Sequence, residues 1–517
     1  GPTRLAVAQA VATAALGIQR ENFLEYEFAN ARAWTEDEGA PKAGLYEVFF
    51  SFEFAQLSIR IGGLAVALVH SLLPDALTAK AGRKKIDLSS QLESIKSFAK
   101  DNISVRARRK VSTVARRRGI PTHRYGVRPD FLLFGQGPWQ KRTNLTITDN
   151  TSALCPAITA NKILANRFLR EMGIPVAPQA TVTSEEQGVK AAKAMGFPVV
   201  TKPRSGNRGR GVTANVTSAS EVRAGIRRAA QVHKQVIIEK YLPGDDYRFV
   251  VINGELVSVI KRVPPHVIGD GKSRVRELVE HTNRTRIRED GWPRNLRVLK
   301  LEDEALRLLA KQNLSPESIP DAGQVVELST AGNGGITVDV TDTVHPDNAA
   351  AAVRAVEIMR IDVGGVDFLL PDPAKSYRET GGGICEVNYM PDIQVHLIAE
   401  GAEKSDMVGS FVRSLFGDQD PCRVASVVAV GYDRDDHGDR ISASLKSAGW
   451  RPGVASARGI LSDGWAITEN RPGWQESTHR VLHDPVCDVA VFAPSLREVH
   501  DAGLGNETLD LFVIGAD

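Results

Sequence analysis

The stretch "KPRSGNRGRGVT", Lys202 to Thr213, follows the apolar run "FPVV" and contains three glycines, four cations and no carboxylate. A lysine at the end of a strand, followed by a positive glycine-rich loop, is typical of an anion site, because glycines let backbone N–H groups approach phosphate oxygens. The tip of a surface hairpin has the same composition. This stretch alone therefore leaves both interpretations open.

Three further segments carry the oxygen-bearing side chains that a nucleotide site needs. "EKYLPGDDYR" (Glu239 to Arg248) follows the apolar run "QVII", "GGVDFLL" places Asp367 in a strand-like run, and "GGGICEVNYMP" contains Glu386 and Asn388. Side chains two positions apart in a strand leave the same face. Carboxylate and amide oxygens are the ligands that Mg2+ prefers. For Glu386 and Asn388 alone a structural hydrogen-bond role is the alternative, but together with Lys202 they favour a nucleotide–metal site.

The composition is that of ordinary globular material, with 517 residues, 42% of them apolar, and a net charge of +3. At about 100–200 residues per domain this length predicts three to four domains. The near balance of charge gives no general argument for nucleic acid. The basic segment of residues 106–119 could contact RNA or phosphate, but aromatic side chains for base stacking are absent around it, so we interpret it as a solvated helix face.

The longest apolar run, Ile61 to Leu73, stops short of the ~20 residues that a membrane span requires and predicts a buried helix. The four cysteines match no metal or disulfide spacing, which favours a reduced, cytoplasmic compartment. We therefore expect no nucleic acid and no membrane among the partners.

Breaks in the pattern divide the chain into three parts. Up to about residue 158, helix-like and strand-like segments mix. The second part alternates helical and apolar segments, and its "YRFVVINGELVSVIKRV" carries a central Asn-Gly, a strong hairpin signal. A new strand–turn–helix pattern starts after Pro421. We predict an N-terminal α/β domain at 1–158, a second domain at 159–417 and a C-terminal α/β domain at 418–517.

The order of these motifs resembles that of the ATP-grasp ligases. Lys162, Lys202, the glycine loop, "EKYLPGDDYR", Asp367 and "EVN" follow one another as in that fold, and the sequence is most similar to the ATP-grasp part of the cyanophycin synthetases, with bifunctional glutathione synthetase close by. The similarity extends from about Tyr46 to Gly417. It implies an α/β protein in which an ATP-grasp domain, with a lid at about 195–245, follows a mixed α/β domain and precedes a truncated Mur-ligase-like α/β domain.

The resemblance implies a nucleotide-binding role for two groups of residues. The phosphates of ATP would be held and covered by Lys162, Lys202, Gly206, Asn207, Arg208, Gly209, Arg210 and Gly211. The adenine hinge and the ribose contact would come from Glu239, Tyr241, Leu242 and Asp246.

The resemblance also implies the groups that act on the reacting atoms. Two Mg2+ ions would be bound by Asp367, Glu386 and Asn388. The catalytic set would be Arg248, Arg262 and Lys202, with Arg248 facing the transferred phosphoryl group. The substrate side would include Arg262, His266, Asn333, Gly334, Gly335 and Asp392. Arginines at these places can stabilise the oxyanion that develops during acyl transfer.

The substrate side departs from the family pattern. The Ser-Thr-Gly-Gly loop of cyanophycin synthetases is replaced by a shorter "NGG", Asn333 to Gly335, and their "PGFRMH" becomes "YMPDIQVH", with Asp392 in place of the glycine. In the Mur-like part, Asp435 stands where the phosphate-binding lysine belongs, and neighbouring acids would repel a triphosphate. We expect an unchanged reaction on a different substrate and a C-terminal remnant that no longer binds ATP.

The leading hypothesis is an ATP- and Mg2+-dependent ligase that joins an amino acid or small peptide carboxylate to an amine through an acyl phosphate. One alternative is a glutathione-synthetase-like or γ-glutamyl ligase. Another is a catalytically silent nucleotide-binding scaffold that partners a second ligase. The resemblance further implies a homo-oligomer, a dimer or tetramer.

Overall fold

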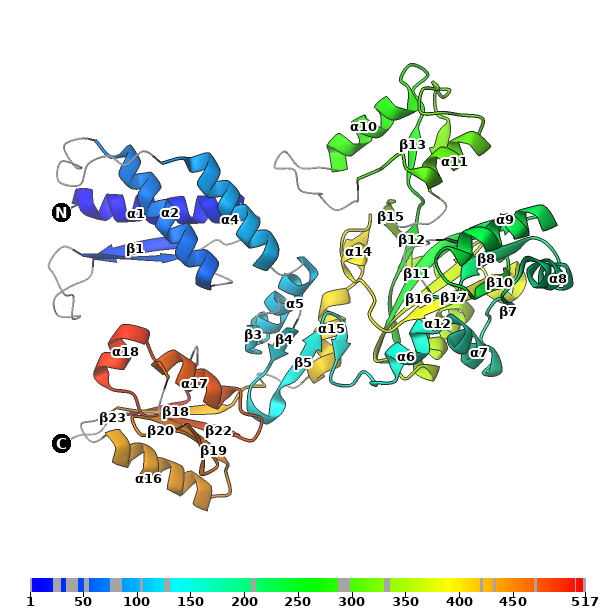
Figure 1. The fold of residues 1–517 in the computed structure, drawn as a ribbon. Helices are drawn as coiled ribbons and strands as arrows, with labels where there is room; N and C mark the ends of the chain where they lie inside the picture. Colours follow the sequence, from blue (N-terminus) through cyan, green and yellow to red (C-terminus); the bar gives the residue numbers. More distant parts are fainter. Residues whose placement is uncertain are drawn as a thin grey trace. The chain divides into compact units, whose positions relative to one another are not determined.

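The computed structural model describes residues 2–21, 29–33, 45–50, 55–74, 86–102, 106–124, 131–205, 211–286, 298–329, 335–418, 422–430, 434–468, 472–506 and 508–514. Its contacts define two compact units. One comprises residues 106–423, and the other comprises 1–105 together with 424–517 (Figure 1). This division by contacts is distinct from the domains inferred from the sequence, whose boundaries near 158 and 417 stay predictions.

A five-stranded antiparallel sheet forms the centre of residues 106–423. Its strands, in spatial order, are β15 (Thr337–Asp339), β12 (Glu255–Arg262), β11 (Asp245–Ile252), β16 (Val363–Leu370) and β17 (Gly383–Asn388). Asn253 and Gly254 join β11 to β12 with φ of 47° and 80°. Positive φ at both central residues is what a tight hairpin turn requires, so the predicted Asn-Gly hairpin is confirmed.

One face of this central sheet is mainly apolar, with the ion pair of Lys261 and Asp245 at its end. It is covered by α7 (Lys162–Glu171) and α12 (Pro346–Ile358), and its core includes Tyr247, Phe249, Val251, Val366 and Phe368. A Cβ on Gly364 would lie 2.6 Å from Val356 of α12, so the absence of a side chain there lets the helix approach the strand. Each fully buried Phe contributes about 1.5–3 kcal/mol relative to an exposed one. This face anchors the strands that carry the site.

The opposite face is apolar over only one half. There Val250, Ile252 and Val363 pack beneath α15 (Met407–Phe416) and α5 (Arg106–Arg117). The predicted basic helix is thus present, with its apolar side in this core and Lys110, Arg116 and Arg117 exposed. Because side chains alternate along strands, the other half of the same face receives the charged residues of the four longest strands.

A small antiparallel sheet joins the same core. Its strands are β3 (Thr122–Arg124), β4 (Phe131–Phe134), β5 (Lys141–Asn144) and β6 (Ile147–Thr148). Leu132 and Phe134 of β4 pack with the residues beneath α15. The short helix α6 (Cys155–Ala160) then leads into α7.

A second four-stranded antiparallel sheet lies between residues 179 and 240. Its order is β7 (Gln179–Val182), β10 (Val236–Lys240), β8 (Val199–Pro203) and β9 (Thr213–Val216). Two helices, α8 (Glu185–Met195) and α9 (Ala219–Ala230), pack against it around a shared apolar core (Figure 1). Ser184 and Ser218 cap these helices by accepting backbone N–H bonds, which fixes where each begins.

An insertion between the strands of the central sheet forms its own small core. It contains β13 (His266–Ile268), β14 (Val325–Glu327), α10 (Val275–Arg286) and α11 (Asp303–Lys311), packed around Val267, Val275, Leu309 and Val326.

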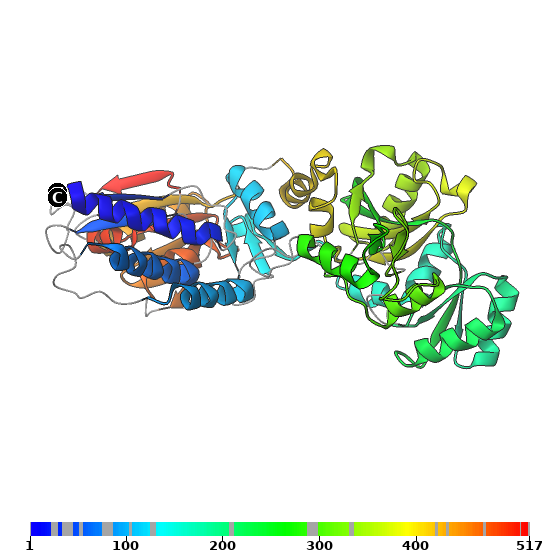
Figure 2. The same ribbon diagram turned by 90° about the horizontal axis from the view of Figure 1, so that it is seen from above.

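The described residues of the N-terminal segment form three helices and one antiparallel pair of strands. The helices are α1 (Pro2–Glu21), α2 (Ala55–Leu72) and α4 (Leu88–Asn102), and the strands are β1 (Ala29–Ala33) and β2 (Tyr46–Phe50). Figure 2 shows the helices, in shades of blue, lying alongside one another. The predicted helix is confirmed from Ile61 to Leu72 as part of α2, but it is only partly buried, because Ile61, Leu64 and Ala65 are buried whereas Val66 and Leu72 are exposed. Within the described residues, no helix combines the length and apolar character needed to cross a bilayer.

Residues 424–514 form a six-stranded sheet. Its order is β21 (Trp465–Thr468), β20 (Gly459–Ser462), β19 (Pro452–Ser456), β22 (Val489–Phe492), β18 (Ala425–Val430) and β23 (Leu511–Ile514), and β18 runs parallel to both of its neighbours. The helices are α16 (Arg434–Ser447), α17 (Trp474–Leu482) and α18 (Leu496–Ala502). The predicted strand–turn–helix unit is confirmed by β18 and α16, whereas the connecting residues 431–433 lie outside the described part of the chain.

Candidate active site

Charged residues from four strands meet on the polar half of the central sheet. Asp246 of β11 lies opposite Arg262 of β12, Arg248 lies opposite Asp367 of β16, and Asp367 lies opposite Glu386 of β17. Residues directly opposite one another in antiparallel strands project to the same face. The strand register therefore gathers the predicted ribose contact, the two catalytic arginines and two of the predicted metal ligands.

Two arginines converge on the carboxylate of Asp367. Arg248 donates to both of its oxygens from Nε and Nη2, and Nη2 of Arg262 lies 3.1 Å from Oδ2. The same Nη2 lies 2.5 Å from Oδ1 of Asp246. The side chains of Arg248, Arg262 and Asp367 are each only 13–14% exposed. Such deeply placed charges persist only when they are well paired, and here an acid–base chain of four groups supplies the pairing.

The two acids of this chain differ in their pKa. Burial alone would raise the pKa of Asp367, but the charges of Arg248 and Arg262 lower it below its usual value. For Asp246 burial is the larger effect and raises the pKa, although Arg262 opposes it. Asp367 is therefore the firmly ionised member of the pair.

A glycine beside this network makes room for the guanidinium of Arg248. A Cβ on Gly365 would lie 2.8 Å from Pro391 and 3.4 Å from Nη1 of Arg248. Asn388 is the residue opposite Gly365. The two glycines before Asp367 thus make room on both faces of the sheet. Gly364 lets α12 approach one face, and Gly365 leaves space for Arg248 on the other.

A second buried ion pair lies on the four-stranded sheet. Nζ of Lys202 on β8 lies 2.6 Å from Oε2 of Glu239 on β10, and Gln179 of β7 also donates to that oxygen. Burial alone would lower the pKa of Lys202, but the charge of Glu239 and the bond to it raise the pKa above its usual value. The ammonium thus stays charged inside the protein. Glu386 also contributes to this effect, which puts Lys202 within electrostatic reach of the central sheet.

Lys162 approaches Glu386 from another direction. It is the first residue of α7, which begins where Asn161 accepts the backbone N–H of Leu164. Lys162, Cys385 and Glu386 line one small cavity of about 10 Å³. Both predicted phosphate-binding lysines are therefore near the same carboxylate.

The predicted adenine hinge follows β10. The backbone N–H of Tyr241 donates to the carbonyl of Pro198, 3.2 Å away, and Leu242 packs closely against Gly383 at the start of β17. The side chain of Glu239 points to Lys202 rather than to solvent. The hinge residues thus connect the two sheets.

Other predicted residues are not joined to this network by any described interaction. His266 bonds through Nδ1 to the carbonyl of Pro264, at 2.9 Å. Asp392 is exposed and accepts the backbone N–H of Gln394, at 3.0 Å, at the start of the helix α14 (Gln394–Leu397). Gly335 packs against the carbonyl of Val263. Their substrate roles stay predictions.

Part of the predicted site lies outside the described residues. This applies to the lid residues Gly206, Asn207, Arg208, Gly209 and Arg210 and to Asn333 and Gly334. Gly211, the last residue of the glycine loop, lies in the described part of the chain and has a φ of +77°.

Three residues at the site carried no role in the sequence-based prediction: Gln179, Ser258 and His396. Ser258 and His396 are bonded to each other and fully buried. For Ser258 the sequence did offer a signal, because the alternation of side chains along a strand places it on the same face as Arg262. For His396 the sequence offered none, because α14 is too short for a helical pattern.

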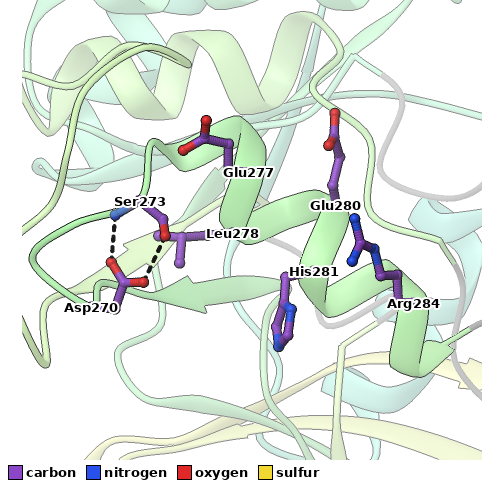
Figure 3. Close-up of a pocket in the computed structure, with 7 residues that line it drawn as sticks. All are labelled: Asp270, Ser273, Glu277, Leu278, Glu280, His281 and Arg284. Carbon is purple, nitrogen blue, oxygen red and sulfur yellow. Dashed lines mark hydrogen bonds between the residues drawn. The ribbon is translucent and has the colours of Figure 1, made fainter.

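A larger cavity, of about 350 Å³, lies on α10 and the turn before it (Figure 3). Asp270 there accepts hydrogen bonds from the backbone N–H and hydroxyl of Ser273, and these bonds with that of Lys272 lower its pKa to about 2. The other lining residues are Glu277, Leu278, Glu280, His281 and Arg284. No predicted site residue lines it, and one helix with its preceding turn provides all the lining. The convergence of four strands makes the central sheet the better candidate.

Among the described residues, the predicted magnesium ligands do not belong to a cluster of acidic side chains. Across the described ranges, no group of three or more His, Cys, Asp or Glu residues is arranged to hold a metal ion. The predicted magnesium set contains two carboxylates and one amide, so it rests on donor chemistry rather than on a preformed acidic cluster.

Comparisons with known proteins identify similar sequences. Residues 168–271 match the family described as D-ala D-ala ligase C-terminus. The chain is 30% identical over 478 residues to cyanophycin synthetase from a Nostoc species, which covers 91% of this chain and 52% of the relative. It is 31% identical over 282 residues to the glutathione biosynthesis bifunctional protein of Mannheimia succiniciproducens, covering 53% of this chain and 37% of the relative. A crystal structure of the bifunctional glutathione synthetase from Pasteurella multocida gives a TM-score of 0.47 at 26% identity, over 69% of this chain and 49% of that chain.

The chain resembles the ATP-grasp ligases, on a mixed α/β architecture. Within this class the resemblance to the cyanophycin synthetases is confirmed by similarity over nine-tenths of the chain. The chain spans about half the length of the curated relatives it matches.

Proposed function

We propose that this protein is an ATP- and Mg2+-dependent ligase that forms an amide bond between the carboxylate of an amino acid or small peptide and an amine. The observation that carries the proposal is the buried chain Arg248–Asp367–Arg262–Asp246 beside Glu386. Burying so many paired charges costs desolvation free energy, and such a concentration of charge is typical of an active site.

The residues of the central sheet fit a hard cation. Asp367 and Glu386 lie opposite each other, Asn388 follows on the same face, and all three offer oxygen donors. The buried amide nitrogen of Asn388 has no hydrogen-bond partner among the described residues, so it can donate to an acceptor such as a phosphate oxygen while the amide oxygen faces the metal. We propose that these three side chains hold two Mg2+ ions. Bound Mg2+ would neutralise charge on the phosphates.

Each remaining residue has a role in the proposed reaction. Lys162 and Lys202 bind the phosphates of ATP, and the backbone after Glu239 holds the adenine. The substrate carboxylate attacks the γ-phosphorus, ADP leaves, and an acyl phosphate forms. The amine nitrogen then attacks the acyl carbon, the C–O bond to phosphate breaks, and inorganic phosphate leaves while the amine loses a proton. Arg248 and Arg262 stabilise the negative charge that develops in both steps.

The proposal for the substrates rests on sequence differences from the relatives. The relatives that match over most of this chain are cyanophycin synthetases, and the loop around Gly335 and the segment around Asp392 depart from their pattern. We propose a substrate other than the one their name indicates. A glutathione-synthetase-like or γ-glutamyl ligase is the alternative, supported by the similarity to a glutathione biosynthesis protein.

On the same resemblance we propose the domains inferred from the sequence, the loss of nucleotide binding in the C-terminal part and a homo-oligomeric state. The spacing of the four cysteines supports the proposal of a cytoplasmic location.

Purified protein incubated with ATP, Mg2+ and a panel of amino acids and γ-glutamyl dipeptides tests the function. We expect phosphate release that depends on both an acid and an amine, with one amide product by mass spectrometry per phosphate released. Glu386→Gln, which preserves size and hydrogen bonding, serves as the control and should remove turnover. If neither phosphate nor product forms while ATP still binds, the silent scaffold is the better account.

A further inference from the structure

The nucleotide side of the proposed site contains a glutamine that has no part in the reaction proposed above. Gln179, the first residue of β7, lies directly opposite Glu239 of β10, and Lys202 of β8 lies opposite Ile237 of β10. Opposite residues share a face of a sheet, and so do residues two apart on one strand. Gln179, Glu239 and Lys202 therefore lie on one face of the four-stranded sheet, whereas α8 and α9 pack on the other face, against Ile238.

The amide group of Gln179 is held in one orientation. Its Nε2 donates to Oε2 of Glu239, the same oxygen that Nζ of Lys202 approaches to 2.6 Å. An ionised carboxylate only accepts hydrogen bonds, so the nitrogen of the amide, and not its oxygen, must face it. Two donors from two different strands thus hold Oε2 of Glu239. The direction of its second oxygen, Oε1, is thereby fixed.

Two acceptor atoms of this bonded pair have no donor. Oε1 of Gln179 is buried and has no hydrogen-bond partner among the described residues. Glu239 is only 6% exposed, and within the described part of the chain its Oε1 takes part in no hydrogen bond. Buried polar groups of native proteins are almost always paired. The two acceptors therefore indicate a ligand that brings N–H donors.

The pair lies beside the predicted adenine hinge. The backbone N–H of Lys240 donates to the carbonyl of Pro178, at 3.0 Å. This bond joins the residue after Glu239 to the residue before Gln179. Tyr241, the next residue along the chain, belongs to the predicted hinge. The charged acceptor and the hinge backbone therefore lie together at one end of β10.

We propose that Gln179 is a positioning residue for base recognition, which holds the carboxylate of Glu239 so that its Oε1 accepts from the exocyclic amino group of a 6-aminopurine. This inference rests on the proposed ligase function, which places adenine at the hinge. The amino group of adenine donates N–H bonds, whereas a 6-oxopurine presents an acceptor oxygen at the same place. A carboxylate held there attracts the first and repels the second. Gln179 thus contributes to the selection of ATP over nucleotides with a 6-oxo base.

Binding of ATP and of inosine triphosphate (ITP), which carries a 6-oxo base, tests this role. Titration calorimetry with the full-length protein and Mg2+, without amino acid substrates, should give a Kd for ITP at least about 100-fold above that for ATP, because a site that binds an N–H group rejects an analogue without it. This ratio of the two constants measures base selection. It is read without any turnover.

Gln179→Met nearly keeps the shape of the side chain but removes the donor, so the carboxylate of Glu239 can turn. The ratio should fall by about 10-fold, mainly through weaker binding of ATP, as expected for a weakened hydrogen bond to a charged group. Thr181→Val is the matched control, because Thr181 lies on the same strand and face but opposite Ile237. It should leave the ratio unchanged.

A double-mutant cycle separates positioning from a merely structural role. If Gln179 acts through Glu239, then Gln179→Met made in the Glu239→Gln background should change the ratio by less than about twofold. A structural glutamine predicts instead that Gln179→Met weakens both nucleotides equally and lowers thermal stability, with the ratio unchanged. An unchanged ratio, or the same fall in both backgrounds, overturns the proposal.

The outcomes also distinguish this inference from the proposed function. Ligase activity with ATP, together with equal binding of ATP and ITP, overturns the inference alone. Base selection that depends on Gln179 in a protein without ligase activity means that the proposed function has failed while the inference stands. A wild-type protein that binds neither nucleotide overturns both.

Discussion

The central sheet of residues 106–423 and the six-stranded sheet of residues 424–514 are both covered by helices, but they differ in the polar groups that they bury. The buried polar side chains described in the second region are all hydroxyls, namely Ser426, Ser456, Ser462, Ser477 and Thr478. The first region buries ionisable groups as well, among them Arg108, Lys202, Glu239, Arg286, Asp339 and His396.

The hydroxyls of the second region are satisfied locally. Ser477 donates to the carbonyls of Pro472 and Gly473, and Thr478 bonds to those of Gln475 and Gly505. Such bonds complete a fold and need no second function. The buried charges of the central sheet bond mainly to one another, and replacing such groups with apolar residues is often neutral or stabilising in other proteins. Their presence in the first region, and not among the described residues of the second, favours the first region as the place of the proposed chemistry.

The strongest test of this difference is Asp367→Asn. The substitution removes the negative charge that Arg248 and Arg262 share and replaces one of its two acceptor oxygens by an amide donor. Breaking a buried pair by removing one partner destabilises a protein by about 3–5 kcal/mol. We expect the free energy of unfolding in urea, monitored by hydrogen exchange in β11 and β16, to fall by this amount. Ligase turnover should be lost as well.

The matched control lies in the second region. Asp488 accepts hydrogen bonds from the backbone and side chain of Arg451, at 2.7 Å and 3.2 Å, but the arginine side chain is 48% exposed. Asp488→Asn should therefore lower stability by about 1 kcal/mol or less. Equal effects of the two substitutions would remove the distinction between the sheets.

A smaller effect is expected for the buried pair on the four-stranded sheet. Lys202→Met leaves Glu239 buried without its cation and should destabilise the protein by about 3 kcal/mol. The double variant with Glu239→Gln removes the orphaned charge and should recover most of that loss. Nucleotide binding, measured by titration calorimetry, should stay weak in both. Recovery of binding in the double variant would contradict the assignment of Lys202 to the phosphates.

Parts of this arrangement were predictable from sequence, and the reason is local. The Asn-Gly turn follows from the backbone preferences of two adjacent residues, and the shared face of Glu386 and Asn388 follows from strand alternation. The pairing of Arg248 with Asp367 was not predictable from residue types, because the two are 119 positions apart and meet only through the register of β11 and β16. A shift of register by one residue would place these side chains on opposite faces.

The orientation of Glu239 shows the same limit. The resemblance to the ATP-grasp ligases implied a role at the adenine hinge. Its carboxylate bonds to Lys202, which comes from a neighbouring strand and is 37 positions away. The contact between His396 and Ser258 escaped prediction altogether, because only tertiary packing brings the two residues together.

The second region provides a prediction for pH. Burial, with a smaller contribution from the nearby His479, lowers the pKa of His483 to about 4. Unfolded histidine takes up a proton below its ordinary pKa of about 6.5, whereas folded His483 does so only near pH 4. Stability of residues 424–514 should therefore fall as the pH is lowered from about 6.5 to 4, by at most about 1.4 kcal/mol per pH unit. Thermal unfolding of His483→Gln across that range should show a shallower slope, and an unchanged slope would show that another group titrates.

The smallest expected effect concerns a buried hydroxyl. Ser426 donates to the carbonyl of Thr508, at 3.0 Å, and accepts from the amide of Asn506, at 3.1 Å. Ser426 is 0% exposed, whereas Asn506 is half-buried and Thr508 is exposed, so Ser426→Ala should destabilise the region by about 1 kcal/mol. Hydrogen exchange in β18 provides the measurement, and ligase turnover should not change.

An exposed serine in the same region gives the comparison its sharpest form. Ser447 also donates to a backbone carbonyl, that of Ala443 at 2.9 Å, but it lies on the exposed side of α16. Water can replace this bond and alanine is the better helix former, so Ser447→Ala should be neutral or slightly stabilising. The difference between the two serines isolates burial from hydrogen bonding. If Ser426→Ala proves as damaging as Asp367→Asn, burial alone rather than charge governs both sheets, and the buried arginine–aspartate chain loses its value as a marker of the active site.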